Sequence, residues 1–393
     1  MKEGRQAWLV VGAAFTSMFT VFGAVYSFGA FFEPMAREFH TGQGLTSVLF
    51  AVTAFSFFSL GAVSGAVADR VGPRRVVLVG AAAMGLGLAL TAVTPAFWLG
   101  CLTYGLGVGV GTACAYVPMV AAVGGWFGRR RSLAIGMAVS GIGAGTLVGP
   151  PVAEVLIERL GWRQAYLVLA AATVVLLVAC AVAAEAPPVA AAAGAGARGL
   201  GRVLRTRAFG LLYATGLLSG FALFMALVHI VPYAQRLGSS PLSAAALVSV
   251  VGVGSVSGRL VLGGAADRLA PVNAFRLSMA ILLLSYVLWL LAPGYAVLAC
   301  FALALGVGYG GWVALSPSVM AELFGPAGLG GSVGALYTSA GIGALLGPPF
   351  AGFIVDATGG YLPAIVTAIG MATVSVALAA LLPGGRDAAT RER

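Results

Sequence analysis

The chain has 393 residues, of which 60% are hydrophobic and only 9% are charged. Soluble domains carry about a quarter charged residues, so this excess of apolar surface has to face lipid. The net charge of +10 does not indicate a nucleic-acid partner, because the basic residues lie in short clusters between apolar runs and form no basic face interleaved with aromatics. We therefore expect a protein surrounded by membrane lipid.

Twelve apolar stretches are long enough to cross the hydrocarbon core, which needs about 20 residues. The first is longer than the hydrophobic region of a signal peptide and is followed by more spans, so we expect it to be retained. The predicted spans are residues 8–32, 45–68, 76–94, 97–122, 132–157, 163–183, 209–233, 242–266, 273–292, 295–320, 330–355 and 361–382.

Basic residues are unevenly distributed between alternate loops. If the N-terminus is cytoplasmic, 17 of the 22 lysines and arginines fall on inner segments, four fall on outer segments, and Arg259 lies within a helix. Cytoplasmic loops carry such an excess, so both termini are predicted to be cytoplasmic. The alanine- and arginine-rich composition is typical of a bacterium with a GC-rich genome, and we expect a multi-pass protein of the cell inner membrane.

The segment 185–208 differs in composition from the rest of the chain, because it is rich in Ala, Gly and Pro and then basic. It divides the chain into an N-terminal six-helix bundle (1–184), a cytoplasmic linker (185–208) and a C-terminal six-helix bundle (209–393). The linker is either disordered or carries a short helix that lies on anionic headgroups.

The two halves repeat each other in register. GAVADR at 65–70 recurs as GGAADR at 263–268, and GTLVGPP at 145–151 recurs as GALLGPP at 343–349, both after 198 residues. This shift carries six spans onto six in the same direction. Such halves pack around an axis along the membrane normal, with the substrate site between them at mid-depth. The sequence predicts an all-α membrane protein with twelve transmembrane helices in two pseudo-symmetric six-helix bundles.

Acidic residues follow the second and eighth spans and lie beside arginines. Exchangeable ion pairs there could hold one conformation; alternatively, the arginines only anchor the cytoplasmic side. The stretch GAVADRVGPRRV resembles the cytoplasmic motif of the major facilitator superfamily, which implies a charge latch. The predicted latch residues are Asp69, Arg70, Arg74, Arg75, Asp267 and Arg268.

The residue types of the glycine–proline elements affect how helices pack and bend. Small residues let helices approach closely, and proline removes a backbone hydrogen bond and bends a helix. These elements either form bends on which the halves rock or only pack closely. They comprise Gly145, Gly149, Pro150, Gly343, Gly347 and Pro348.

Two further motifs resemble the monocarboxylate transporter family. Glu3, Gly4 and Trp8 match a motif before the first span, and WFGRRRSLAIGMAVSG at 126–141 matches a more specific one that enters the fifth span. The resemblance covers essentially the whole chain and places it with the bacterial organic-anion porters. It implies a monomeric secondary active or facilitative transporter of monocarboxylates, such as lactate or pyruvate, that works by alternating access.

Arg259 lies within the predicted eighth span. A charge there costs roughly 2.5–3.5 kcal/mol on insertion scales, so such a residue usually faces a cavity and a partner. No acid is obvious in the neighbouring spans, and a guanidinium binds a carboxylate bidentately. The alternative is a side chain that reaches the cytoplasmic interface. In the monocarboxylate family the eighth span carries an arginine that binds the substrate carboxylate, and Arg259 matches that position.

The chain differs from the family at positions that the resemblance links to proton coupling. Family members often carry an aspartate one turn before that arginine, where this chain has Ser255, and mammalian relatives have a first-span lysine that is absent here. His229 is the remaining candidate for proton coupling, since an imidazole titrates near neutral pH. The alternative, which we favour, is that it only lines the outer mouth or bonds to a carbonyl freed near Pro232. Five acids near the outer ends are expected to be solvated: Glu33, Glu38, Glu154, Glu158 and Asp356.

Several polar aromatic residues within spans could donate hydrogen bonds to a carboxylate or could only satisfy a neighbouring helix: Tyr26, Tyr116, Tyr309, Trp312 and Tyr337. We favour the first two and the last. The predicted substrate-binding residues are Arg259, Tyr26, Tyr116, Tyr337 and Ser255.

Two other functions can be weighed on the same residues. A drug or other small-solute exporter or antiporter usually needs a buried acid for a cation, whereas this chain offers a buried base. An enzyme would need a clustered nucleophile, base or metal set, and the sequence shows neither that nor a GxxxxGK[ST] loop. We therefore expect no enzyme activity, no cofactor and no metal.

Overall fold

The computed structural model describes residues 4–127, 131–184, 197–325 and 329–384, and every element in these residues is helical. Twelve helical segments of the described chain are long and apolar enough to span a membrane, which confirms the predicted number of spans. The helices are α1 (Arg5–Tyr26), α2 (Phe28–Glu38), α3 (Gln43–Val71), α4 (Pro73–Val93), α5 (Phe97–Gly100), the π-helical η1 (Cys101–Val108), α6 (Gly109–Trp126), α7 (Arg131–Leu160), α8 (Trp162–Ala183), α9 (Ala197–Leu204), α10 (Arg207–Arg236), α11 (Pro241–Leu269), α12 (Pro271–Leu290), α13 (Tyr295–Phe324), α14 (Leu329–Thr358) and α15 (Leu362–Ala380).

Helix boundaries differ from the predicted spans mainly by extension. The first span is α1 and α2 together, with a break at Ser27, whose hydroxyl donates to the carbonyl of Gly23 at 2.6 Å. Helix α10 begins at Arg207, inside the predicted linker, because the hydroxyl of Thr206 caps it by accepting from Phe209 N. The linker also contains the short helix α9, whose location on headgroups stays a prediction; residues 185–196 lie outside the described chain.

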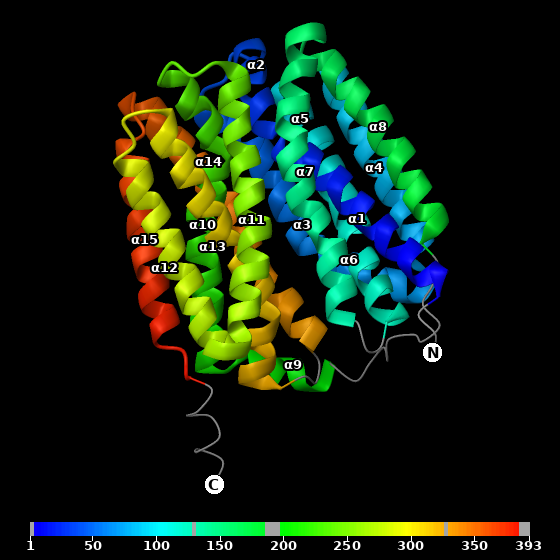
Figure 1. The fold of residues 1–393 in the computed structure, drawn as a ribbon. Helices are drawn as coiled ribbons and strands as arrows, with labels where there is room; N and C mark the ends of the chain where they lie inside the picture. The colour runs from blue at the N-terminus through cyan, green and yellow to red at the C-terminus, as the bar shows by residue number, and fades with distance from the viewer. Residues whose placement is uncertain (1–3, 128–130, 185–196, 326–328, 385–393) are drawn as a thin grey trace.

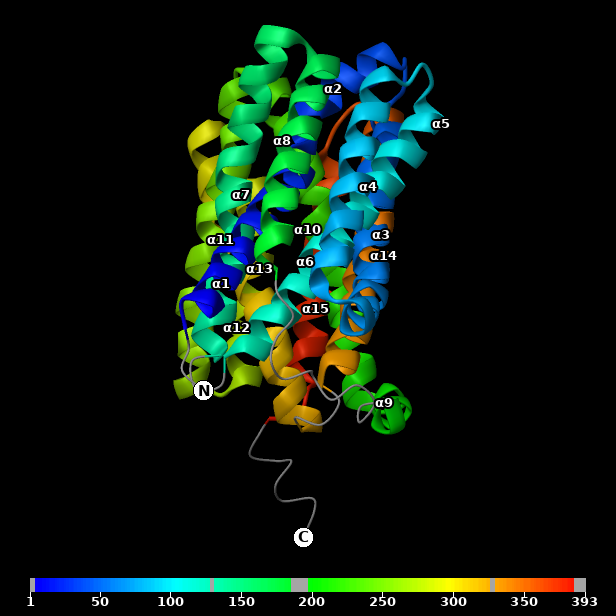
Figure 2. The ribbon, with the colours of Figure 1, turned by 90° about the vertical axis from the view of Figure 1, so that its right-hand side faces the viewer.

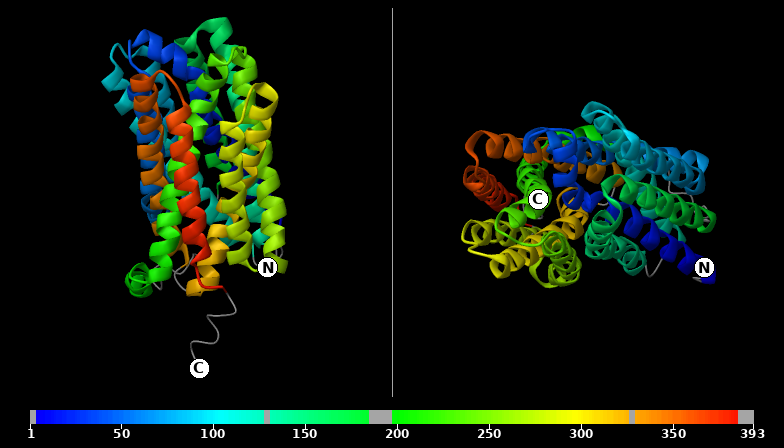
Figure 3. Two further views of the ribbon diagram at one scale, coloured as in Figure 1. Left: turned by 90° about the vertical axis from the view of Figure 1, so that its left-hand side faces the viewer. Right: turned by 90° about the horizontal axis from the view of Figure 1, so that it is seen from above.

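The two halves stand side by side, with α1–α8 in one and α10–α15 in the other (Figure 1). Both ends of the described chain lie at the lower face in Figure 1, which we name the terminal face, and α9 lies across that face (Figure 2). We name the other end the opposite face. Seen along the bundle axis, the helices of each half form their own cluster (Figure 3).

Two helix pairs join the halves: α3 packs against α14, and α7 packs against α11. The repeat relates α3 to α11 and α7 to α14, so these two contacts are equivalent. Toward the opposite face the side chains between the halves are sealed, since Ser47 and His229 are fully buried. Toward the terminal face, Tyr116 and Tyr337 are only half-buried. The halves are therefore packed more tightly at the opposite face than toward the terminal face.

The glycine–proline elements pack each half internally. A Cβ at Gly145 would lie against the carbonyl oxygen of Phe19 in α1, and a Cβ at Gly347 would lie against that of Phe221 in α10. Helices α7 and α14 continue through both proline pairs. The geometry supports close packing, and a role as bends on which the halves rock stays a prediction.

Candidate functional site

Arg259 lies on α11, and its side chain reaches α7 of the other half. Its Nη1 donates to the carbonyl oxygen of Val139 on α7, at a long 3.5 Å. Its guanidinium carbon is 5.9 Å from the ring centroid of Tyr309 on α13. The side chain is half-buried, so it is held within the protein and does not extend freely toward the terminal face.

The other edge of the guanidinium is unused. Nε and Nη2 of Arg259 are buried, and neither has a hydrogen-bond partner among the described residues. These two N–H groups point the same way from one edge of the planar group, in the geometry that binds both oxygens of one carboxylate. Leaving such charged donors buried and unpaired is costly, so this edge is typical of a ligand site.

One tyrosine ring lies near this guanidinium, and three more tyrosines lie within electrostatic range of it. The hydroxyls of Tyr26 and Tyr309 lie 2.9 Å apart and join α1 to α13 across the two halves. Arg259 also interacts electrostatically with Tyr26, Tyr116 and Tyr337. The structure thus brings all three favoured tyrosines to Arg259 and adds Tyr309.

Tyr309 was one of the candidate aromatics, but nothing in the sequence favoured it over the others. Its position follows from the glycines beside it. A Cβ at Gly306 or Gly310 would lie against the carbonyl oxygens of Val251 and Ser255, so α13 packs directly on the backbone of α11. That close approach brings the Tyr309 ring to the guanidinium, and the alternating glycines were the available signal.

Ser255 lies one turn before Arg259 and is 2% exposed. Its hydroxyl has no hydrogen-bond partner among the described residues. Residues four apart on a helix face each other, so an acid at this position would reach the guanidinium. The serine leaves the charge of Arg259 uncompensated there.

His229 lies apart from this site, in a cluster near the opposite face. Its Nε2 is 2.9 Å from the carbonyl oxygen of Pro348 and 3.1 Å from the hydroxyl of Ser47, and its Nδ1 is 3.3 Å from the Tyr361 hydroxyl. The Tyr361 hydroxyl donates to Gln43 Oε1 at 2.6 Å, and burial raises the pKa of this phenol. A carbonyl only accepts, so Nε2 carries a proton.

Asp356 extends that cluster. Its carboxylate accepts hydrogen bonds from the backbone N–H groups of Gln43 and Gly44, each at 2.8 Å. These groups begin α3, where a helix has free donors and a partial positive charge. Asp356 is exposed, as expected of a solvated acid, and in addition its carboxylate caps α3. We name Gln43, Ser47, His229, Asp356 and Tyr361 the opposite-face lock, because they join α3 to the C-terminal half.

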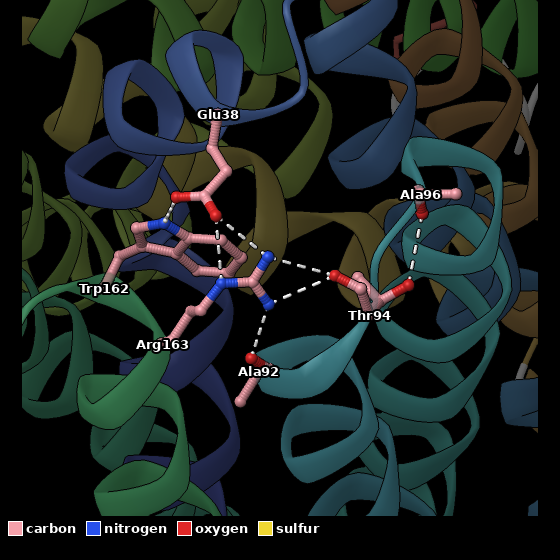
Figure 4. Close-up of polar contacts among 6 residues, drawn as sticks. All are labelled: Glu38, Ala92, Thr94, Ala96, Trp162 and Arg163. Atoms are coloured by element: carbon pink, nitrogen blue, oxygen red, sulfur yellow. Dashed lines mark hydrogen bonds and ion pairs between the residues drawn. The ribbon is translucent and has the colours of Figure 1, made fainter.

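Of two further acids near the outer ends, Glu38 is exposed as expected, whereas Glu154 is buried, contrary to the expectation. Glu38 accepts from Trp162 Nε1 at 3.0 Å and pairs with Arg163, whose Nη1 donates to the carbonyls of Ala92 and Thr94 (Figure 4). Glu154 is 5% exposed, because it faces the packed interior of the bundle. The residues next to Glu38 and Glu154 in the sequence do not predict these tertiary contacts.

The predicted latch residues whose side chains are described do not form ion pairs with one another in this conformation. Asp69, Arg70, Arg74 and Arg75 are exposed, and within the described chain none of them makes an ion pair or a hydrogen bond. Arg268 is also exposed, and the side chain of Asp267 lies outside the described part. The latch stays a prediction for another conformation.

The family model of the Major Facilitator Superfamily matches residues 14–337. The chain is 30% identical to monocarboxylate transporter 13 of Bos taurus over 93% of this chain and 87% of the relative. It is 31% identical to human monocarboxylate transporter 11 over 91% and 79%. A bacterial homolog of the human lysosomal transporter Spinster, solved in an inward-facing and occupied conformation, has a TM-score of 0.75 at 15% identity and covers 97% of each chain. The chain therefore belongs to the major facilitator superfamily, and it is a multi-pass membrane transporter of small organic solutes and not an enzyme.

Proposed function

We propose that this transporter carries small monocarboxylates such as pyruvate or lactate by alternating access, and that the Nε and Nη2 edge of Arg259 binds the carboxylate. The observation that carries the proposal is this buried, unpartnered edge between the halves. The names of the relatives at 30% and 31% identity agree with that substrate class.

The surrounding residues favour a single negative charge on the substrate. Among the described residues no other cation lies within the tyrosine shell of Arg259, so one carboxylate neutralises the site. The hydroxyls of Tyr26 and Tyr309 lie beside the guanidinium and are suited to bond the second polar group of a 2-oxo or 2-hydroxy acid. A dianion such as oxalate would bring one uncompensated charge.

The conformation fits one stage of alternating access. We assign the terminal face to the cytoplasm of an inner-membrane protein, because the basic loops lie there. The opposite-face lock then closes the outer side, and substrate exchanges with the cytoplasm. Opening toward the outside would separate Asp356 from α3 and bring the latch residues together.

His229 is fully buried within the lock, and its Nε2 donates to the carbonyl oxygen of Pro348. We assign it to closure of the outer side, and its part in proton exchange stays a prediction.

The test is transport by the purified protein in liposomes that are preloaded with unlabelled pyruvate. We expect uptake of labelled pyruvate or lactate by the wild type. Arg259→Lys keeps the charge but cannot offer two parallel N–H groups, so the apparent affinity should fall at least about tenfold, as the loss of one charged hydrogen bond predicts.

Arg37→Lys is the matched control, because the Arg37 side chain is 80% exposed and lies far from the site. It should transport like the wild type. The proposal fails if the wild type carries no monocarboxylate, or if Arg259→Lys retains wild-type affinity.

A further inference from the structure

Resting on the proposed function, we infer that this transporter is an obligatory exchanger of organic anions: one carboxylate enters only as another leaves. The inference concerns the empty protein, in which Arg259 has no substrate. It follows from the charge that this empty form has to enclose whenever it changes from one side to the other.

The empty site holds a full positive charge. A guanidinium keeps its proton in proteins, so it cannot lose its charge in the way that a buried lysine or histidine can. In the present conformation Arg259 is half-buried, so part of the residue is still exposed. Closing the protein over the empty site would remove this exposure.

Nothing in the described residues compensates that charge. Arg259 makes no ion pair there, and the position one turn away is the neutral Ser255. The buried acid Glu154 lies 15 residues from Val139 along α7, or about 22 Å. Asp267 is eight residues further along α11, about 12 Å toward the terminal face.

The two contacts that the guanidinium makes with neutral groups compensate its charge only weakly. Its hydrogen bond to Val139 is 3.5 Å long, beyond the usual range for N–H donors. The ring centroid of Tyr309 is 5.9 Å away, at the limit of about 6 Å for a cation over an aromatic face. Both contacts leave Nε and Nη2 unpaired.

A bound carboxylate compensates the positive charge of Arg259. The loaded site is neutral and both N–H groups are paired, so the protein can close over it and open to the other side. The unloaded protein must instead carry an unpaired charge through a closed state. Loaded reorientation is therefore fast in both directions and empty return is slow, which makes transport an exchange of one monoanion for another without net charge movement.

The first experiment compares uptake of labelled pyruvate into liposomes with and without internal pyruvate. We expect uptake to be at least tenfold faster into the preloaded liposomes, which corresponds to about 1.4 kcal/mol in the barrier to empty return. A potassium diffusion potential should leave the exchange rate unchanged.

Equal rates in empty and preloaded liposomes would overturn the inference while leaving the monocarboxylate function intact. Absence of pyruvate and lactate uptake in both would instead reject the proposed function. The wild-type comparison alone therefore separates the two claims.

The second experiment supplies the missing counter-charge. In Ser255→Asp an acid four residues before Arg259 can pair with the empty guanidinium. Uptake into empty liposomes should rise, and the ratio of preloaded to empty uptake should fall at least threefold. Ser255→Asn, which matches the size without the charge, should keep the wild-type ratio. A well-folded Ser255→Asp that still transports only by exchange would overturn the charge argument.

Discussion

At the scale of single residues, the site depends on hydroxyls as well as on the guanidinium. The Tyr26 and Tyr309 hydroxyls come from different halves and meet at 2.9 Å beside Arg259. In the conformation described the two hydroxyls remain in contact. A substrate that binds beside them therefore contacts both halves at the same time. Loss of either hydroxyl should therefore weaken binding without removing the aromatic wall.

Tyr309→Phe keeps the ring near Arg259 and deletes its hydroxyl. We expect the apparent affinity for pyruvate to fall about fivefold, since a neutral hydrogen bond contributes about 1 kcal/mol. The measurement is the concentration dependence of exchange in preloaded liposomes.

Tyr295→Phe is the control, because it also loses one hydroxyl, which donates to the Ser243 carbonyl at 3.0 Å away from the site. Unchanged affinity in Tyr309→Phe would remove that hydroxyl from the binding site.

Residue identities in the site could be predicted only in part. Arg259 could be identified because a charged residue in an apolar span is costly and usually has a function. Tyr26, Tyr116 and Tyr337 could be identified as polar aromatic residues within spans. Tyr309 was ranked lower, because its position depends on how α13 packs against α11. The burial of Glu154 was not predicted, and neither were the tertiary contacts of Asp356 and Glu38, since the sequence near a helix end does not show an acid's tertiary partner.

At the scale of helices, glycine sets how closely neighbours pack. Gly145 faces the backbone of α1, where a Cβ would meet the carbonyl oxygen of Phe19. Gly136 lies on the same helix, α7, and has open space around it. The two positions therefore separate the effect of packing from the effect of helix propensity.

Gly145→Ala should lower the thermal stability of the purified protein, because overpacking a close contact costs about 1–3 kcal/mol. Gly136→Ala should leave it unchanged or raise it slightly, because alanine favours the helix. The unfolding temperature in detergent measures both. Equal stability of the two variants would show that α1 and α7 can separate without loss.

The helices themselves were the most predictable level, because apolar length and the 198-residue repeat both determine them. Their ends were less predictable: α10 begins inside the expected linker, and the first span extends to Glu38. The hydrocarbon core requires only about 20 apolar residues, whereas helices continue into the headgroup region on capping contacts that hydropathy does not register.

At the scale of the whole molecule, the closed opposite face depends on few polar contacts between the halves. Asp356 bonds the first two N–H groups of α3, and these contacts must break if the outer side opens. The sequence could not predict this lock, because its contacts between the halves join residues more than 100 positions apart in the chain and two of its members, Gln43 and Tyr361, lie at helix ends.

Asp356→Asn should weaken the lock and favour opening at the opposite face, since the neutral amide offers one acceptor oxygen in place of two. The measurement is the labelling of a cysteine placed at Val228, which is 1% exposed between the halves, by a membrane-impermeant reagent added at the opposite face. Labelling should be several-fold faster than with Asp356 intact.

Glu158→Gln is the control, because Glu158 is an exposed acid near the end of α7 at the same face. If Asp356→Asn and Glu158→Gln label at the same rate, Asp356 does not hold the opposite face closed.

The central claim is that the Nε and Nη2 edge of Arg259 binds the substrate carboxylate, and a structure of the protein with pyruvate in lipid nanodiscs tests it most directly. We predict the two carboxylate oxygens at about 2.8 Å from Nε and Nη2, with the rest of the molecule between Tyr26 and Tyr309. Pyruvate bound away from Arg259, with the guanidinium turned toward headgroups at the terminal face, would contradict the account.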